Sequence, residues 1–431
     1  MLKNTINMGD VNESYSSKLA LFQKPFVETA VKEIYYVDFS PKNSFSQNSS
    51  IEFNIEPTSP DYIDLSRSHL RIKARILTNE GKPIGAENNV AFVNLTLHSL
   101  FRQVDLMLQG KVVSPDIGIN YIYKAIIIYL LNYGYSSKAA HLQSEVYFKD
   151  VGGMDSAPNS GNRGLDERYD LTKTGLELVM EGPLHLDICQ QERPLINGVG
   201  VTLKLYPNNR KFLLMTQDSV EYQVEITSAS FKVCHVKVSD PVILAQNDVL
   251  KITPALYPFW KSNIKTFSLS SGISTFSSDD IFHGKVPSKL IVGLVRTESY
   301  NGSFTMNPFN FVHSGLNYIE FAVNGKSVPQ EALQPNFSNL DYVTSYLTLF
   351  NNKYPEHKGN FITRDDYDNG YSFFVFDIQG EASEGLMSKA KEGISRLQIR
   401  FSANTSHPLT VILYAQFPSV LCCDKSRNIW F

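Results

Sequence analysis

Short runs in which apolar and polar residues alternate dominate the chain from about residue 31 onward. Residues 70–76 (LRIKARI) carry an apolar side chain at every second position, mostly with basic side chains between them. This period of two is typical of a β-strand with one buried face. Comparable runs occupy residues 34–39 and 51–55, and clusters of Pro, Ser, Asn and Gly separate them. The pattern predicts an all-β protein built from sandwiches of short strands.

The same pattern predicts further strands in both halves of the chain. They are expected at residues 103–108, 176–180, 184–188, 199–205, 222–238, 264–269, 289–295, 318–323, 373–378, 397–401 and 409–416. Two segments, 120–131 and 340–350, favour short helices. Residues 151–168 lack the flanking strand and the Gly-Lys pair of a phosphate-binding loop, so we expect a long irregular surface loop there.

An internal repeat relates the two halves. Residues 98–113 and 313–328 are offset by 215 positions, half the length of the 431-residue chain. Identical residues stand at His98/His313, Ser99/Ser314, Gly110/Gly325, Lys111/Lys326 and Val113/Val328. In both copies an alternating strand leads into a short turn, where the glycine allows a positive φ and a hairpin.

The order of the later elements repeats as well. In each half a helix follows the turn, then a strand ending in Asp-Ile, then another alternating strand. This shared order favours a duplication over a chance similarity between amphipathic strands. We predict an N-terminal arm over residues 1–30 and two similar β-domains, 31–238 and 239–431, which join near Ser239.

Composition narrows the classes of protein. The chain is 42% hydrophobic, which is too apolar for a disordered protein. Its net charge of −3 creates no overall positive field that would hold nucleic acid. The longest apolar run, near residues 125–131, is far shorter than the ~20 residues that span a bilayer, and the first residues lack the apolar core of a signal peptide. The four cysteines do not have the spacing of a zinc site and predict reduced thiols.

The residues that could perform chemistry do not form a set. His98 and His313 are the histidines that the repeat shares, and we expect them to be hydrogen-bonded structural residues, because no carboxylates or further histidines stand at ligand spacing. The acidic pairs 279–280 and 365–366 are expected in turns, since neighbouring side chains on a strand point to opposite faces. Lys111 and Lys326 follow turn glycines and are expected to be solvated. The sequence therefore predicts no catalytic residue, no metal ligand and no cofactor, and a protein that is not an enzyme.

Residues 282–295 (FHGKVPSKLIVGLV), and the stretch from 307–311 (NPFNF) to 324–326 (NGK), resemble the double-jelly-roll major capsid proteins of adintoviruses and Polinton/Maverick elements. The resemblance extends over about residues 30–420. It implies two tandem eight-stranded jelly-roll β-sandwiches with short helices in the inter-strand loops.

This resemblance implies a hexon-like structural function. Three chains would form a homotrimeric, pseudo-hexameric capsomer that tiles an icosahedral shell. The implied partners are neighbouring capsomers, penton and minor capsid proteins, with no sequence-specific nucleic-acid binding and no transmembrane segment. The implied location is the virion, assembled inside the host cell in the cytoplasm or nucleus. The loop 151–168 would project outward or clasp a neighbour, and the N-terminal arm would lie underneath the shell.

Two other classes of protein stay open. A glycan-cleaving enzyme made of tandem β-sandwiches would need a cluster of carboxylates, for which the candidates are Glu177, Glu181, Asp187 and Asp377. The repeated position of Asp187 and Asp377 favours a structural role for both. A glycan-binding pair of modules would use an aromatic residue such as Trp260, for which an anchor at the domain junction is the simpler interpretation.

Overall fold

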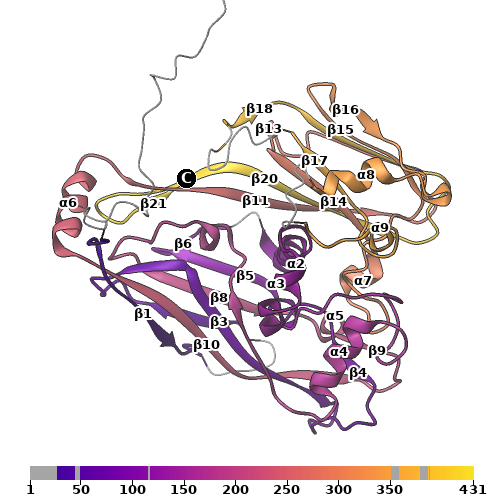
Figure 1. Ribbon diagram of the computed structural model, residues 1–431, viewed down its shortest axis with the longest axis horizontal. Coiled ribbons are helices and arrows are strands. Elements are labelled where there is room, and N and C mark those ends of the chain that lie inside the picture. Colours follow the sequence, from indigo (N-terminus) through magenta and orange to yellow (C-terminus); the bar gives the residue numbers. More distant parts are fainter. Residues whose placement is uncertain (1–26, 44–48, 115–116, 351–358, 379–386, 388) are drawn as a thin grey trace, which may run out of the picture.

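The computed structural model describes residues 27–43, 49–114, 117–350, 359–378, 387 and 389–431. Most of the expected N-terminal arm, residues 1–26, therefore lies outside the described residues. Two β-sandwich units account for most of the described chain. They are stacked on one another, with the earlier unit in indigo to magenta and the later one in red to yellow (Figure 1).

The first unit is made of two four-stranded antiparallel sheets. One sheet has the order β1-β10-β3-β7, and the other has the order β2-β8-β5-β6. The bounds are β1 (Val31–Phe39), β2 (Ile51–Ile55), β3 (Tyr62–Thr78), β5 (Phe101–Leu108), β6 (Lys111–Val112), β7 (Leu178–Pro183), β8 (Val201–Pro207) and β10 (Tyr222–Val238). In β8, Val201, Leu203 and Leu205 are buried while the residues between them are partly exposed, so the alternation in the sequence directs one face to the core.

The second unit repeats this arrangement. Its sheets have the orders β11-β20-β14-β17 and β12-β19-β15-β16. The bounds are β11 (Ala255–Leu269), β12 (Thr275–Asp279), β14 (Lys289–Arg296), β15 (Leu316–Val323), β16 (Lys326–Leu333), β17 (Phe373–Asp377), β19 (Ser395–Phe401) and β20 (Leu409–Cys423). The interior of β14, unlike that of β8, is buried on both faces.

Both units have the same connectivity among eight main strands. In one sheet the first strand pairs with the eighth, the eighth with the third and the third with the sixth. In the other sheet the second pairs with the seventh, the seventh with the fourth and the fourth with the fifth. This connectivity defines a jelly roll. The prediction of two tandem eight-stranded jelly rolls is confirmed.

Short strands and helices fill the connections. The small strands are β4 (Val90–Phe92), β9 (Leu214–Thr216), β13 (Lys285–Val286), β18 (Lys391–Glu392) and β21 (Ile429–Trp430). The α-helices are α1 (Thr96–Ser99), α2 (Tyr121–Asn132), α3 (Tyr135–Lys138), α4 (Arg163–Thr172), α5 (Arg210–Leu213), α6 (Asp240–Leu250), α7 (Thr297–Asn301), α8 (Val343–Leu347) and α9 (Arg364–Asp368). The 3-10 helices are η3 (Gly118–Asn120), η4 (His141–Glu145), η5 (Asp187–Gln190), η6 (Phe337–Asn339) and η7 (Thr348–Phe350). Across the described residues, each helix is too short or too polar to cross a bilayer.

The two turns of the repeat have the same backbone conformation. Gln109 and Gly110 have φ values of 51° and 75°, and Asn324 and Gly325 have φ values of 50° and 75°. Two successive positive φ values are typical of the type I′ hairpin turn, whose twist matches that of the flanking strands. The repeat in the sequence therefore reports a true repeat in the structure.

Three local predictions were wrong, and one helix was missed. Residues 184–188 do not form a strand, because β7 ends at Pro183, which lacks an N–H to continue the ladder, and η5 follows. The segment 151–168 is not all loop, since the side chain of Asn162 accepts a hydrogen bond from Leu165 and caps α4. The helix expected at 340–350 is reduced to α8 and η7. Helix α6, at the expected join near Ser239, was not predicted.

Candidate functional site

A buried cluster of three side chains lies inside the first jelly roll. His98 comes from α1, Glu145 is the last residue of η4, and His185 follows β7. We call these residues the His-Glu-His cluster. Each residue is at most 2% exposed, and one nitrogen or oxygen of each lies within 4.8 Å of the others. Among the described residues, no other group of three His, Cys, Asp or Glu side chains meets this criterion.

The cluster converges on one carboxylate oxygen. Nε2 of His98 lies 2.6 Å from Oε2 of Glu145, and the hydroxyl of Tyr129 donates a hydrogen bond to the same oxygen. Nε2 of His185 lies 3.9 Å from it, which is too far for a hydrogen bond. Both ring nitrogens of His185 are buried without a hydrogen-bond partner among the described residues.

Tyr121 on α2 ties the two histidines together. Its hydroxyl oxygen lies 2.9 Å from Nδ1 of His98, and it accepts a hydrogen bond of 3.3 Å from the backbone N–H of His185. The rings of His98 and His185 meet edge to face, with 4.7 Å between their centroids. The hydroxyl of Tyr121 therefore helps to hold both rings.

Burial and neighbouring charges set the protonation of the cluster. Burial by itself raises the pKa of Glu145, but the contacts with His185 and His98 lower it more, to about 2. Burial lowers the pKa of His185 to about 4, although Glu145 acts in the opposite direction. Near neutral pH the cluster therefore contains a carboxylate and a neutral His185 imidazole.

Gly182 makes room for the carboxylate. A Cβ atom at this position of β7 would lie 2.2 Å from Cδ and 2.4 Å from Cγ of Glu145. Such distances are far below van der Waals contact, so any larger residue would displace the Glu145 side chain. Glycine at position 182 is thus explained by close packing.

Buried polar groups also join the two jelly rolls. Lys124 of α2 forms a fully buried ion pair with Asp187. The other carboxylate oxygen of Asp187 accepts a 2.8 Å hydrogen bond from the backbone N–H of Ser262 on β11. Asp187 therefore links the interior of the first unit to the sheet of the second, and α2 lies between the units in Figure 1.

A second buried junction is built around Asp150. One carboxylate oxygen of Asp150 accepts a 2.7 Å hydrogen bond from the guanidinium of Arg168, and the other accepts a 3.1 Å bond from the Asn307 amide. The nearby Asp155 accepts hydrogen bonds from the backbone N–H of Asn307 and the side chain of Asn310. The segment 151–168, expected to project outward or clasp a neighbour, thus contacts the second jelly roll of its own chain.

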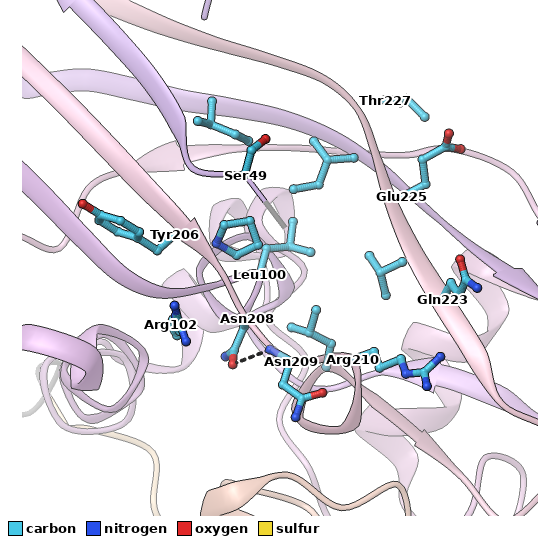
Figure 2. Close-up of a pocket in the computed structure, with 15 residues that line it drawn as sticks. Ser49, Leu100, Arg102, Tyr206, Asn208, Asn209, Arg210, Gln223, Glu225 and Thr227 are labelled. Carbon is cyan, nitrogen blue, oxygen red and sulfur yellow. Dashed lines mark hydrogen bonds between the residues drawn. The ribbon is translucent and has the colours of Figure 1, made fainter. Parts of the chain in front are cut away.

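A groove of about 1020 Å³ opens between the two sheets of the first jelly roll. Figure 2 shows its polar side chains spread around the rim, among them Arg102, Tyr206 and Gln223. Of its charged side chains, Glu225 binds Arg75 at 2.6 Å, and Arg210 is likewise paired with a glutamate. In sites that bind small molecules, a few polar groups converge on one point. The polar groups of this groove do not converge in that way.

The four acids considered for glycan cleavage do not share a cleft. Glu177 and Asp377 are exposed. Glu181 lies on the outer face of its sheet, 3.6 Å from Lys232 and 3.9 Å from Arg71. Asp187 is buried in its ion pair, as described above. The arrangement lacks the facing carboxylates of a glycosidase.

The remaining candidates have local roles. Asp280 lies in a turn at φ 47° and accepts a hydrogen bond from the backbone of Gly284, as predicted. For Asp279 the prediction of a turn was wrong, because this residue is the last of β12 and pairs with Arg396 on β19. The pair 365–366 does not lie in a turn but begins α9, where Asp366 and Thr363 form a capping box. Trp260 is half-buried on β11.

Sequence analysis missed the His-Glu-His cluster because its members are far apart in the chain. Glu145 follows His98 by 47 residues, and His185 follows much later, beyond α4. His98 was expected to be a hydrogen-bonded histidine, and it is one. The expectation that no carboxylate or second histidine approaches it was wrong.

Exposed apolar side chains gather on elements at one end of the molecule. These elements are β1, α6, the start of β11, the end of β20 and β21 (Figure 1). The exposed residues are Val31, Ile34, Tyr36, Leu244, Val249, Ile252, Leu256, Val420, Trp430 and Phe431. An ion pair between Lys32 and Asp240 links β1 to α6. We call this surface the apolar end.

Comparison with known proteins places this fold. No protein-family model matches the chain. An uncharacterized protein of Caenorhabditis elegans is 24% identical over 422 residues, which cover 94% of this chain and 98% of that protein.

Solved structures of viral proteins share the fold. A chain in the 3.5 Å cryo-EM structure of the Sputnik virophage matches with a TM-score of 0.66 and 14% identity, over 98% of this chain and 92% of that one. The Faustovirus major capsid protein gives a TM-score of 0.58 and 9% identity, over 94% and 93%. The mavirus major capsid protein gives 0.53 and 11%, over 98% and 95%. The chain has the double-jelly-roll fold of these proteins.

Proposed function

We propose that the chain is a viral major capsid protein, a structural subunit of an icosahedral shell and not an enzyme. One observation carries the proposal: the two jelly rolls have identical strand order and together match nearly the whole length of proteins named as major capsid proteins. A match to one jelly roll alone would say little about function, because single jelly rolls occur in many kinds of protein. A match of the tandem pair from end to end is much more specific.

The proposed assembly is a homotrimer. Three chains with two similar units each supply six similar blocks, which suit a position with six neighbours in a closed shell. The apolar end supports this proposal, because it carries ten exposed large apolar side chains, and exposed apolar surfaces are typical of sites that a partner covers. The proposed division at residue 239 lies directly before α6 (Asp240–Leu250), so this helix begins the second block.

The finer partners follow from the same proposal. Neighbouring capsomers would contact the outer edges of the trimer, and penton and minor capsid proteins would bind at special positions of the shell. The protein would reside in the virion after assembly inside the host cell. A glycan-cleaving or glycan-binding role has less support, because the candidate acids lie apart and Trp260 is half-buried.

Light scattering on the purified chain, with negative-stain images of the same peak, tests the proposal. Three times the chain mass of 48.6 kDa is about 146 kDa, and the particle should have a hexagonal outline. The double variant Leu244→Glu/Ile252→Glu should reduce the trimer, because charges would be buried at the contact. Glu80→Gln, in the exposed turn after β3, serves as a matched control. A monomer at high concentration would contradict the trimer.

A further inference from the structure

The His-Glu-His cluster has the donors and the geometry of a metal site. We propose that it binds one structural Zn²⁺ ion through Nε2 of His98, Nε2 of His185 and Oε2 of Glu145. The proposal does not depend on the function in a capsid. Its consequence would be to fasten together α1, η4 and the segment after β7, which the chain brings to the interior from three separate regions.

The donor set suits zinc better than other common ions. Imidazole nitrogens together with a carboxylate oxygen are typical zinc ligands, whereas Ca²⁺ and Mg²⁺ prefer sites made of oxygens. The three side chains leave one position of a tetrahedral ion for a water molecule. Since each residue is at most 2% exposed, the ion would be enclosed and acquired during folding.

Of the two distances from the Glu145 oxygen to the histidine nitrogens, one is shorter and the other longer than the distance between two ligand atoms of a zinc site. Two atoms that bind one tetrahedral ion at about 2.0–2.1 Å lie about 3.3 Å apart. The oxygen of Glu145 lies 2.6 Å from Nε2 of His98 and 3.9 Å from Nε2 of His185. A shift of the carboxylate by less than about 1 Å from His98 toward His185 would make both distances suitable for Zn²⁺.

The unpartnered ring of His185 is a second observation, independent of the cluster's donor set, that indicates a bound ion. Both of its ring nitrogens are buried without a hydrogen-bond partner among the described residues, although Nε2 lies 3.9 Å from the carboxylate oxygen that His98 contacts. Buried polar groups in native proteins almost always have a partner. A metal ion between the three side chains would supply the partner that Nε2 lacks.

The surrounding tyrosines form the outer shell that metal ligands require. His98 would carry its ring proton on Nδ1 and donate it to Tyr121 Oη, which leaves Nε2 free for the ion. Tyr129 would keep its hydrogen bond to the carboxylate.

Metal analysis of the tag-free full chain tests the proposal. Protein expressed with added Zn²⁺ and dialysed against a chelator should retain about one Zn²⁺ per chain. After refolding with Co²⁺ in place of Zn²⁺, the protein should show the visible absorption of tetrahedral Co²⁺. The Tm should be higher after refolding with Zn²⁺ than after refolding with the chelator.

A pair of matched variants locates the ion. His185→Leu removes one ligand and should abolish both the retained Zn²⁺ and the Tm difference. His235→Leu is the control, because His235 is also buried and also has two ring nitrogens without a hydrogen-bond partner, but it belongs to no ligand cluster. It should keep the Zn²⁺. If His185→Leu does not fold, Glu145→Gln, which preserves the side-chain shape, should lose the ion instead.

Two results would overturn the proposal. One is wild-type protein that holds no stoichiometric metal after refolding with Zn²⁺ and shows no change in Tm. The other is equal retention of Zn²⁺ by His185→Leu and wild type, which would place the bound ion elsewhere on the chain.

Discussion

His98 and His313 occupy the same position of the sequence repeat, yet their surroundings differ. His98 is fully buried and contacts Glu145 and Tyr121. The side chain of His313 is 29% exposed, and its ring stacks on Phe337 with 3.9 Å between centroids. Aromatic rings and a carboxylate lie beside both histidines, but the carboxylate near His313, that of Asp368, is 3.6 Å away and partly exposed, whereas His98 and Glu145 are both buried.

The Asp-Ile pairs that the sequence repeat aligned are not equivalent in the structure, because Asp187 begins η5 after β7 whereas Asp377 is the last residue of β17. Asp187 is buried between Lys124 and the backbone of Ser262. Asp377 is exposed at the end of β17. His185 lies between β7 and η5, whereas Val375, with which the sequence repeat aligns it, is a buried residue within β17. The two units therefore share their strand order and the hairpin turn, while the buried polar contacts described above lie in the first unit and at its junction with the second.

The largest expected effect comes from Asp187→Ala. This change leaves the ammonium of Lys124 buried without its partner, which costs about 3–5 kcal/mol of unfolding free energy. Asp377→Ala, at the end of β17, should change stability by less than about 1 kcal/mol because the side chain is exposed. Denaturant unfolding of both variants measures the difference. Equal losses would contradict the comparison between the two units.

A smaller effect is expected from Gly182→Ala. The new methyl group would overlap the Glu145 side chain and should cost about 1–3 kcal/mol. Gly293 on β14 makes room for aromatic rings instead, since a Cβ there would lie 2.8 Å from the ring of Phe311. The Tm of Gly182→Ala and of Gly293→Ala, measured by thermal unfolding, compares the cost of a methyl group against a carboxylate side chain with its cost against aromatic rings. An unchanged Tm for Gly182→Ala would show that Glu145 is free to move.

The pH dependence of the unfolding free energy should show the effect of the lowered pKa of Lys138. Its ammonium contacts the carbonyl oxygens of Leu130 and Asn360, one in each unit. Burial lowers its pKa from 10.5 to about 7, with Lys149 acting in the same direction and Asp366 opposing. Between these values the unfolded chain binds the proton and the folded chain does not. This group therefore makes the unfolding free energy rise as pH increases from about 7 toward 10.5.

Denaturant unfolding at several pH values measures this rise. The variant Lys138→Met lacks the titrating group, so its stability should increase less than that of the wild type between pH 7 and 10. Parallel curves for the two proteins would contradict the low pKa of Lys138.

The smallest effect is expected from His313→Leu. The leucine keeps apolar contact with Phe337 and loses the 3.1 Å hydrogen bond from the backbone of Gly315 to Nδ1. We expect a loss of about 0.5–1.5 kcal/mol, measured by denaturant unfolding. A loss of unfolding free energy as large as that of Asp187→Ala would show that the partly exposed His313 contributes as much to stability as the buried Asp187.

Local patterns explain which parts of the fold the sequence could predict. The alternation in β2 and β10 depends on neighbouring residues, and the predicted bounds agree with the structure. The turn at Gln109 and Gly110 was predictable for the same reason. The double jelly roll was implied by family resemblance, because alternation alone does not specify which strands pair.

The His-Glu-His cluster was beyond local reasoning. Its ligand atoms meet only after the segment carrying η4 folds back onto β7, and no periodic pattern relates the three positions. The repeat singled out His98 together with His313. Because His313 does not belong to a comparable cluster among the described residues, the shared position favoured a common structural role for both histidines over a site at His98. Helix α6 was missed although Ser239 and the following Pro241 are a typical helix start.

The buried junction at Asp150 and Asp187 has an evolutionary consequence. If the two units arose by duplication of one jelly roll, the first fused chain needed no buried contact between its two copies. Once charged groups of the first copy depended on Ser262 and Asn307 of the second, separation of the copies would expose those carboxylates and leave their partners unsatisfied. Mutations can therefore specialise each unit, but a return to separate single jelly rolls would carry the cost of these lost buried hydrogen bonds.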